Sequence, residues 1–157
     1  MKKISLAIAL VAVLALVFAA TAFAGTAKAT GGVQYTPEGH FLNFNVHENK
    51  TGTKVWGNVK NRTPDGSSYH AKVCCVNVIS ADTVLFAAEI VASDIPGISV
   101  GNGILIQVKD GGSPGTKGDI VWDQLFSTAA TAAACATQTT PSLGPYAVLS
   151  GNLVVHK

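Results

Sequence analysis

The sequence predicts an all-β protein, an antiparallel β-sandwich of about eight strands with a jelly-roll-like or immunoglobulin-like arrangement. Short apolar stretches alternate with polar residues along most of the chain, which is typical of strands with one buried face. Clusters of Gly, Pro, Asn, Asp and Ser separate these stretches at intervals close to the spacing of sandwich strands. Only one segment is a helix candidate, so an all-β class is the prediction that accounts for most of the chain.

The N-terminus has the layout of a secretory signal peptide. Lys2 and Lys3 precede an apolar run from residue 4 to about residue 20, and Ala22-Phe23-Ala24 forms a small-x-small cleavage signal. We therefore expect residues 1–24 to be a cleaved signal peptide. An uncleaved membrane anchor is the alternative, because the run is nearly long enough to span a bilayer. A second small-x-small site, Ala27-Lys28-Ala29, leaves the position of the cut open.

Removal of residues 1–24 from the 157-residue chain leaves 133 residues, which suits one domain. Residues 25–32 contain three glycines and are predicted to be a flexible leader, followed by a single β-sandwich domain over residues 33–157. The clearest strand alternates Leu42, Phe44 and Val46 on one face with asparagines on the other. The expected strands cover residues 41–47, 53–61, 69–79, 83–92, 104–109, 120–126 and 145–156. Residues 128–136 are Ala-rich but interleaved with Thr, which predicts a loop with at most one helical turn.

The charge of the chain argues against a nucleic-acid partner. The full sequence has 11 Lys and Arg against 9 Asp and Glu, and Lys2 and Lys3 account for the whole excess. The mature chain is therefore neutral and has no basic cluster to hold a phosphate backbone. No segment after the signal peptide is long and apolar enough to span a membrane, so none is expected.

The stretch from Val108 to Asp123 combines three aspartates with four glycines. Two interpretations compete. The glycines favour a tight turn between two strands. Asp110, Asp119 and Asp123 would together supply carboxylate oxygens of the kind that calcium prefers, so these three residues are the candidate metal ligands. No other cofactor is indicated.

The catalytic signals in the sequence are weak. Residues 97–101 fit the G-x-S-x-G pattern, but another β-like run follows, whereas a nucleophile elbow needs a helix. His40, His47, His70 and His156 show no metal-binding spacing. The alternative to a non-enzymatic domain is a small secreted hydrolase or lyase that would use Asp110, Asp119 and His47. Aromatic residues that would form a sugar-stacking platform are Tyr35, Trp56, Tyr69, Trp122 and Tyr146.

The three cysteines are Cys74, Cys75 and Cys135. Export permits disulfides. Neighbouring cysteines in a strand face apart, so Cys135 is expected to pair with one of them and leave one thiol free.

Several motifs resemble the small secreted bacterial domain family called post-COAP-1. They are Gly31-Gly32, Phe41 and Phe44, Thr51 to Gly57, Cys75-Val76-Asn77-Val78, Asp110 to Gly115 with Asp119, and Gly151 to His156. The sequence departs from the family pattern at Gly111, Ser113, residues 116–118 and Asp123. The resemblance implies an exported β-sandwich without a known activity. It also favours Cys75 over Cys74 as the partner of Cys135, because Cys75 occupies the family-like C-x-x-V position.

The predicted function is a secreted or cell-surface structural or interaction module without a catalytic site. Its expected partner is an extracellular protein or a glycan. A calcium-dependent carbohydrate-binding module is a further alternative.

Overall fold

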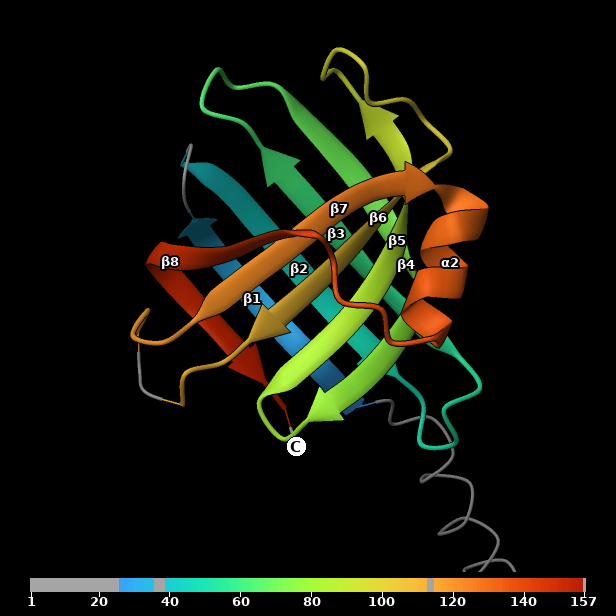
Figure 1. The fold of residues 1–157 in the computed structure, drawn as a ribbon, viewed down its shortest axis with the longest axis vertical. Helices are drawn as coiled ribbons and strands as arrows, with labels where there is room; N and C mark the ends of the chain where they lie inside the picture. Colours follow the sequence, from blue (N-terminus) through green and yellow to red (C-terminus); the bar gives the residue numbers. More distant parts are fainter. Residues whose placement is uncertain (1–25, 36–38, 113–114, 157) are drawn as a thin grey trace, which may run out of the picture.

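The computed structural model describes residues 26–35, 39–112 and 115–156, so the predicted signal peptide lies outside the described residues. The described part forms eight antiparallel strands and one helix (Figure 1). They are β1 (Thr26–Tyr35), β2 (His40–Glu48), β3 (Val55–Arg62), β4 (Ser68–Ser80), β5 (Thr83–Ser93), β6 (Asn102–Lys109), β7 (Ile120–Ser127), α2 (Thr128–Ala136) and β8 (Leu143–Val155). The prediction of an all-β antiparallel protein with about eight strands is confirmed.

The strands form one closed barrel, so the two-sheet sandwich is not what the structure shows. Each strand pairs with the next one along the chain, and β8 pairs with β1 to close the circle. Sandwiches and barrels both alternate inward and outward residues along every strand, so periodicity does not distinguish them. What distinguishes them is whether the first and last strands meet, and the first strand was not recognised in the sequence.

The prediction of a flexible leader is wrong over residues 26–32, because these residues belong to β1. Gly31 pairs with Phe44 of β2, and a Cβ atom at Gly31 would lie only 2.7 Å from the Phe44 ring. The glycine therefore makes room for a core aromatic ring. A comparable close approach occurs at the closing seam, where Gly151 has φ +103° and a Cβ atom would lie 2.0 Å from the carbonyl oxygen of Gly32. These glycines permit tight strand contacts rather than flexibility.

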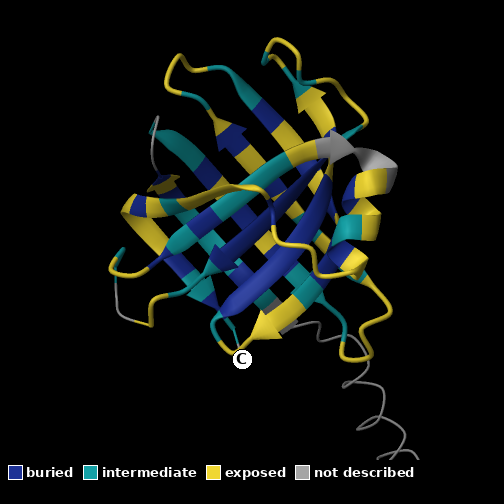
Figure 2. Ribbon diagram, viewed as in Figure 1, coloured by how far each residue is buried: buried dark blue, intermediate teal, exposed yellow. Residues whose placement is uncertain are grey.

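Apolar side chains fill the barrel interior. Figure 2 marks the buried positions along the strands. Across the described residues, the largest fully buried side chains are Phe86, Leu42, Leu85, Ile90, Leu105 and Ile106, followed by valines at positions 33, 46, 59, 84, 108 and 121. Of these, Leu85 and Leu105 belong to a second, smaller cluster outside the barrel wall. The barrel is therefore a packed core rather than an open calyx, as expected for eight strands with large inward side chains.

Helix α2 covers the second cluster. It lies against β4, β5 and β6, where Leu85, Ala87 and Leu105 pack around Cys135 of the helix. The prediction of a loop is wrong here, because docking onto the barrel stabilises a helix that is too short to be stable alone. In the described part, no helix has the length and apolar character needed to cross a bilayer.

A disulfide joins Cys75 of β4 to Cys135 of α2, the pairing favoured by the sequence motif. A β-bulge between Val73 and Cys75 explains the geometry. Val73 and Val76 face the barrel core, whereas Cys75 packs in the outer cluster. The extra residue, Cys74, is exposed and is a free thiol. Asn77 of β4 donates a further hydrogen bond to the carbonyl oxygen of Cys135, so two interactions tie the helix to the same strand.

Candidate functional site

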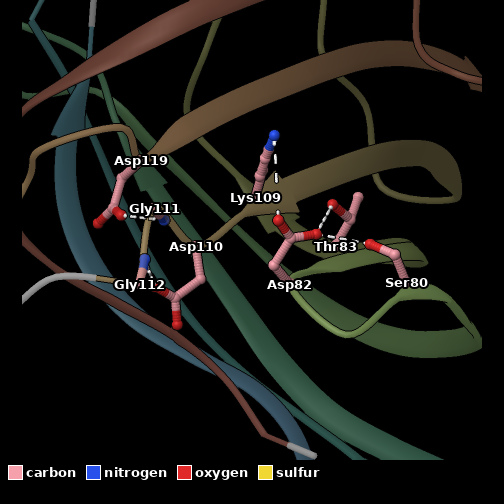
Figure 3. Close-up of polar contacts among 8 residues, drawn as sticks. All are labelled: Ser80, Asp82, Thr83, Lys109, Asp110, Gly111, Gly112 and Asp119. Carbon is pink, nitrogen blue, oxygen red and sulfur yellow. Dashed lines mark hydrogen bonds and ion pairs between the residues drawn. The ribbon is translucent and has the colours of Figure 1, made fainter.

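Two of the predicted calcium ligands lie together at one end of the barrel, in the β6–β7 connection (Figure 3). Asp119 Oδ1 accepts a hydrogen bond from the backbone N–H of Gly111 at 2.8 Å. Asp110 accepts one from Gly112 at 2.7 Å and one from Val155 at 3.0 Å. The two carboxylates therefore organise the turn and fasten it to the end of β8. This is the role that the turn interpretation gives to this stretch.

Asp123 does not join the other two carboxylates, so the structure does not bring the three predicted ligands together. It lies within β7 and pairs with Ile106, on the inward face that also carries Val121. Its Oδ2 accepts a hydrogen bond from Tyr35 at 2.8 Å. The stretch after Asp119 is a strand, and alternation along that strand directs Asp123 into the barrel. In the part of the chain described, no group of three or more His, Cys, Asp or Glu side chains could hold a metal ion.

Asp119 carries a buried carboxyl group. Its side chain is 2% exposed, and Oδ2 is buried without a hydrogen-bond partner among the described residues. Burial is the largest effect on its pKa, which it raises above the usual range, and the nearby charge of Asp110 raises it further. A raised carboxyl pKa means that the folded state binds the proton more tightly than the unfolded chain. The stabilising contribution is therefore present at low pH and is lost as the pH rises above 3.8 and through the folded pKa.

We expect Asp119→Asn to be as stable as the wild type at pH 7, within about 1 kcal/mol, because the amide oxygen can still accept the Gly111 N–H. Urea unfolding from pH 4 to 7 should show a smaller loss of stability with rising pH than in the wild type. A chelator should leave the wild-type melting temperature unchanged. A fall of several degrees on chelation that this variant lacks would instead establish a calcium site.

The residues of the alternative enzymatic interpretation do not converge. His47 stacks on Trp56 on the barrel wall, with ring centroids 5.5 Å apart and planes tilted by 7°. Asp110 and Asp119 are fastened to the β6–β7 turn. The G-x-S-x-G stretch lies in the connection between β5 and β6 and is not followed by a helix. His47 therefore lies on the outer wall, whereas the two aspartates lie at the β6–β7 turn.

A second polar cluster, which the sequence did not indicate, lies inside the barrel. Asn61 donates to the phenol oxygen of Tyr35 at 3.0 Å, and Tyr35 donates in turn to Asp123. His40 Nδ1 lies 3.3 Å from Asn61 Oδ1. Tyr69 pairs with Asn61 across β3 and β4, and its buried phenol oxygen has no hydrogen-bond partner in the described part. The residues come from five strands, so only the folded register reveals the cluster.

The phenols of this inner cluster are held neutral. Burial is the main cause that raises the pKa of Tyr35, and the charge of Asp123 adds to it. Burial and then Asp123 also raise the pKa of Tyr69. Tyr35 lies 5.6 Å from the ring of Tyr146 and 5.8 Å from that of His40, centroid to centroid. The predicted aromatic platform is therefore divided, with Tyr35, Tyr69 and Tyr146 facing inward and Trp56 facing solvent.

The outer wall formed by β2, β3 and β4 carries a third polar group of residues. Cross-strand pairing places Asn43, Lys60 and His70 in one row and Asn45, Asn58 and Lys72 in the next. All six side chains are exposed. We call these two rows the Asn/Lys face. Neighbouring strands lie about 4.8 Å apart, so each row spans about 10 Å of the wall.

The Asn/Lys face is hollowed and bordered by aromatic rings. A surface hollow of about 320 Å³ is lined by residues of both rows, among them Asn43, Asn58 and Lys60. Trp56, which is 38% exposed, extends the surface beyond the second row. On the other side, Arg62 lies over the ring of Phe41 at 5.7 Å from its centroid. The Asn/Lys face thus combines amides and cations with aromatic rings at its borders.

The electrostatics of the Asn/Lys face differ from those of the whole chain. The outward positions of β2–β4 hold Lys60, Arg62 and Lys72 but no Asp or Glu. The nearest carboxylate across the strands is Glu89 of β5, which pairs with Lys72. Alternation along β3 is enough to place Trp56, Asn58 and Lys60 on one side of the strand. The grouping of these residues with those of β2 and β4 requires the register of the folded barrel.

Comparisons with known proteins were made on three levels: no family model matches the chain, no curated protein matches it, and no solved structure matches it.

Proposed function

We propose that the mature protein is an exported, non-enzymatic binding domain whose Asn/Lys face binds an acidic extracellular polysaccharide. The observation that carries this proposal is the pair of exposed rows on β2–β4, which combine three asparagines with Lys60, Lys72 and His70 and contain no carboxylate. The predicted signal peptide and the resemblance to post-COAP-1 domains support an exported binding module. The disulfide also agrees with an oxidising compartment.

The side chains of the face suit an acidic sugar. A carboxamide presents both a donor and an acceptor, which match the hydroxyl groups of a sugar ring. The ammonium groups of Lys60 and Lys72 form charge-assisted hydrogen bonds to carboxylate or sulfate. Trp56 provides an exposed aromatic surface, and its stacking on His47 holds it in place. The filled barrel interior favours binding on the outside, because the core side chains leave no room for a sugar chain.

The double variant Lys60→Ala, Lys72→Ala should bind carboxylated or sulfated polysaccharide about tenfold more weakly than the wild type. Two exposed charge pairs of up to about 1 kcal/mol each account for a loss of this size. Affinity electrophoresis or calorimetry at two salt concentrations would measure it, with polygalacturonate and chondroitin sulfate as ligands and dextran as the neutral comparison. Binding should weaken as salt increases.

The matched control is Lys50→Ala, Lys117→Ala, which removes the same charge from exposed turns outside the face. It should bind like the wild type. Trp56→Ala should weaken binding without changing its salt dependence. Equal losses in both double variants, or equal binding of single-stranded DNA, would show non-specific attraction to polyanions and contradict the proposal.

A further inference from the structure

The inner cluster has a feature that packing alone does not explain. Tyr69 is 3% exposed, and its phenol oxygen is buried without a hydrogen-bond partner among the described residues. Buried polar groups in native proteins are nearly always paired, and an orphan costs about 1–3 kcal/mol. Replacement by Phe would remove that cost and keep the ring. The buried hydroxyl therefore offers a donor and an acceptor to a ligand that reaches the cluster.

The surroundings of Tyr69 define the chemistry of that partner. Asp123 lies close enough for its charge to act on both Tyr69 and Tyr35. The rings of Tyr35 and Tyr146 lie 5.6 Å apart beside it. A carboxylate among neutral phenols and aromatic faces attracts a cation, because the faces carry negative quadrupole charge and the oxygens accept hydrogen bonds. An ammonium group suits this chemistry, because it can donate hydrogen bonds to a carboxylate and to a phenol oxygen.

The cluster is also reachable. Asp123, His40 and Tyr146 are only partly buried, whereas Tyr35, Tyr69 and Asn61 are buried beneath them. The mouths of β-barrels are common positions for small-ligand sites. The cluster thus combines a partly buried carboxylate with a fully buried phenol.

We propose that this end of the barrel binds a small organic ammonium ion between Asp123, Tyr69 and the rings of Tyr35 and Tyr146. The site is separate from the Asn/Lys face, because its residues point into the barrel and those of the face point outward. The two proposals therefore stand or fall independently. A ligand with one primary amine and a short apolar group matches the carboxylate, the phenol oxygen and the aromatic rings of the site.

The test uses the disulfide-bonded mature protein and methylammonium, ethylammonium and trimethylammonium chlorides, with sodium chloride at equal ionic strength as the reference. Saturable binding should appear in titrations followed by tyrosine fluorescence and NMR. At a concentration ten times the Kd, the melting temperature should rise by about 4 °C. No saturable response to any of the three ions would overturn the proposal.

Variants then assign the site. Asp123→Asn should abolish binding, whereas Asp65→Asn, the same charge change in an exposed turn, should have no effect. Tyr69→Phe should fold with an unchanged or higher melting temperature but bind about five- to tenfold more weakly. Undiminished binding by Tyr69→Phe would refute the assignment of this hydroxyl even if Asp123→Asn did not fold. None of these changes should alter polysaccharide binding.

Discussion

Cys135→Ala is expected to lower the free energy of unfolding by about 4 kcal/mol. The disulfide closes a loop with a sequence separation of 60 residues, and the chain-entropy model gives this value for a loop of that length. A domain of this size is typically stable by about 5–15 kcal/mol, so the loss is a large part of the total. Urea unfolding followed by tryptophan fluorescence, with and without reductant, would measure it.

The free thiol allows a sharper version of the experiment. In Cys75→Ala, the exposed Cys74 is the next residue and can offer a substitute bridge to Cys135, whereas Cys135→Ala leaves no partner. Cys75→Ala should therefore lose less stability than Cys135→Ala, and the difference should vanish in reductant. Cys74→Ser is the control and should change stability by less than about 0.5 kcal/mol. Unfolding curves of Cys135→Ala that match the wild type would show that the bridge does not form.

Phe86→Ala is expected to cost about 3–5 kcal/mol. Phe86 is fully buried in the middle of β5 and packs against the Phe44 ring, with centroids 5.4 Å apart. Truncation would leave a cavity that the rigid barrel wall cannot fill, because the surrounding strands are fixed by their pairing. Chemical denaturation of the variant and the wild type at 25 °C would measure the difference in the free energy of unfolding.

Val91→Ala on the same strand is the matched control. Its side chain is 43% exposed, so it should change stability by less than about 0.5 kcal/mol. If Phe86→Ala cost less than about 1 kcal/mol, the ring would not be a central part of the core. The comparison keeps the strand and its backbone pairing the same and varies only burial.

The strands were predictable because alternation is a local property. Leu42, Phe44 and Val46 face the core as their spacing indicates. The first strand was not recognised because glycines on their own indicate a flexible segment. A glycine is needed at position 31 because the Phe44 ring of β2 occupies the space of a side chain there. Helix α2 was likewise missed, since its stability comes from the contacts of Cys135 with β5 and β6.

The candidate sites were less predictable than the strands. Asp123 was grouped with Asp110 and Asp119 because they are close in sequence, but Asp123 lies within β7 and accepts a hydrogen bond from Tyr35 inside the barrel. The partners of Tyr35 in the inner cluster, Asn61 and Asp123, are 26 and 88 residues away. A site formed by residues that meet through cross-strand register cannot be predicted from their spacing in the sequence. The disulfide was easier to predict, because three cysteines allow few pairings.

The meeting of β1 and β8 also governs when this protein can finish folding. Thr30 hydrogen bonds to His156 across a separation of 126 residues, so the seam joins nearly the two ends of the described chain. Proteins dominated by such distant contacts fold slowly, on a scale of roughly milliseconds to seconds. During export, β1 can pair with β2 but lacks its other neighbour until β8 has crossed the membrane. If the protein is exported through a membrane as an unfolded chain, the barrel therefore closes only after the whole chain has arrived on the far side.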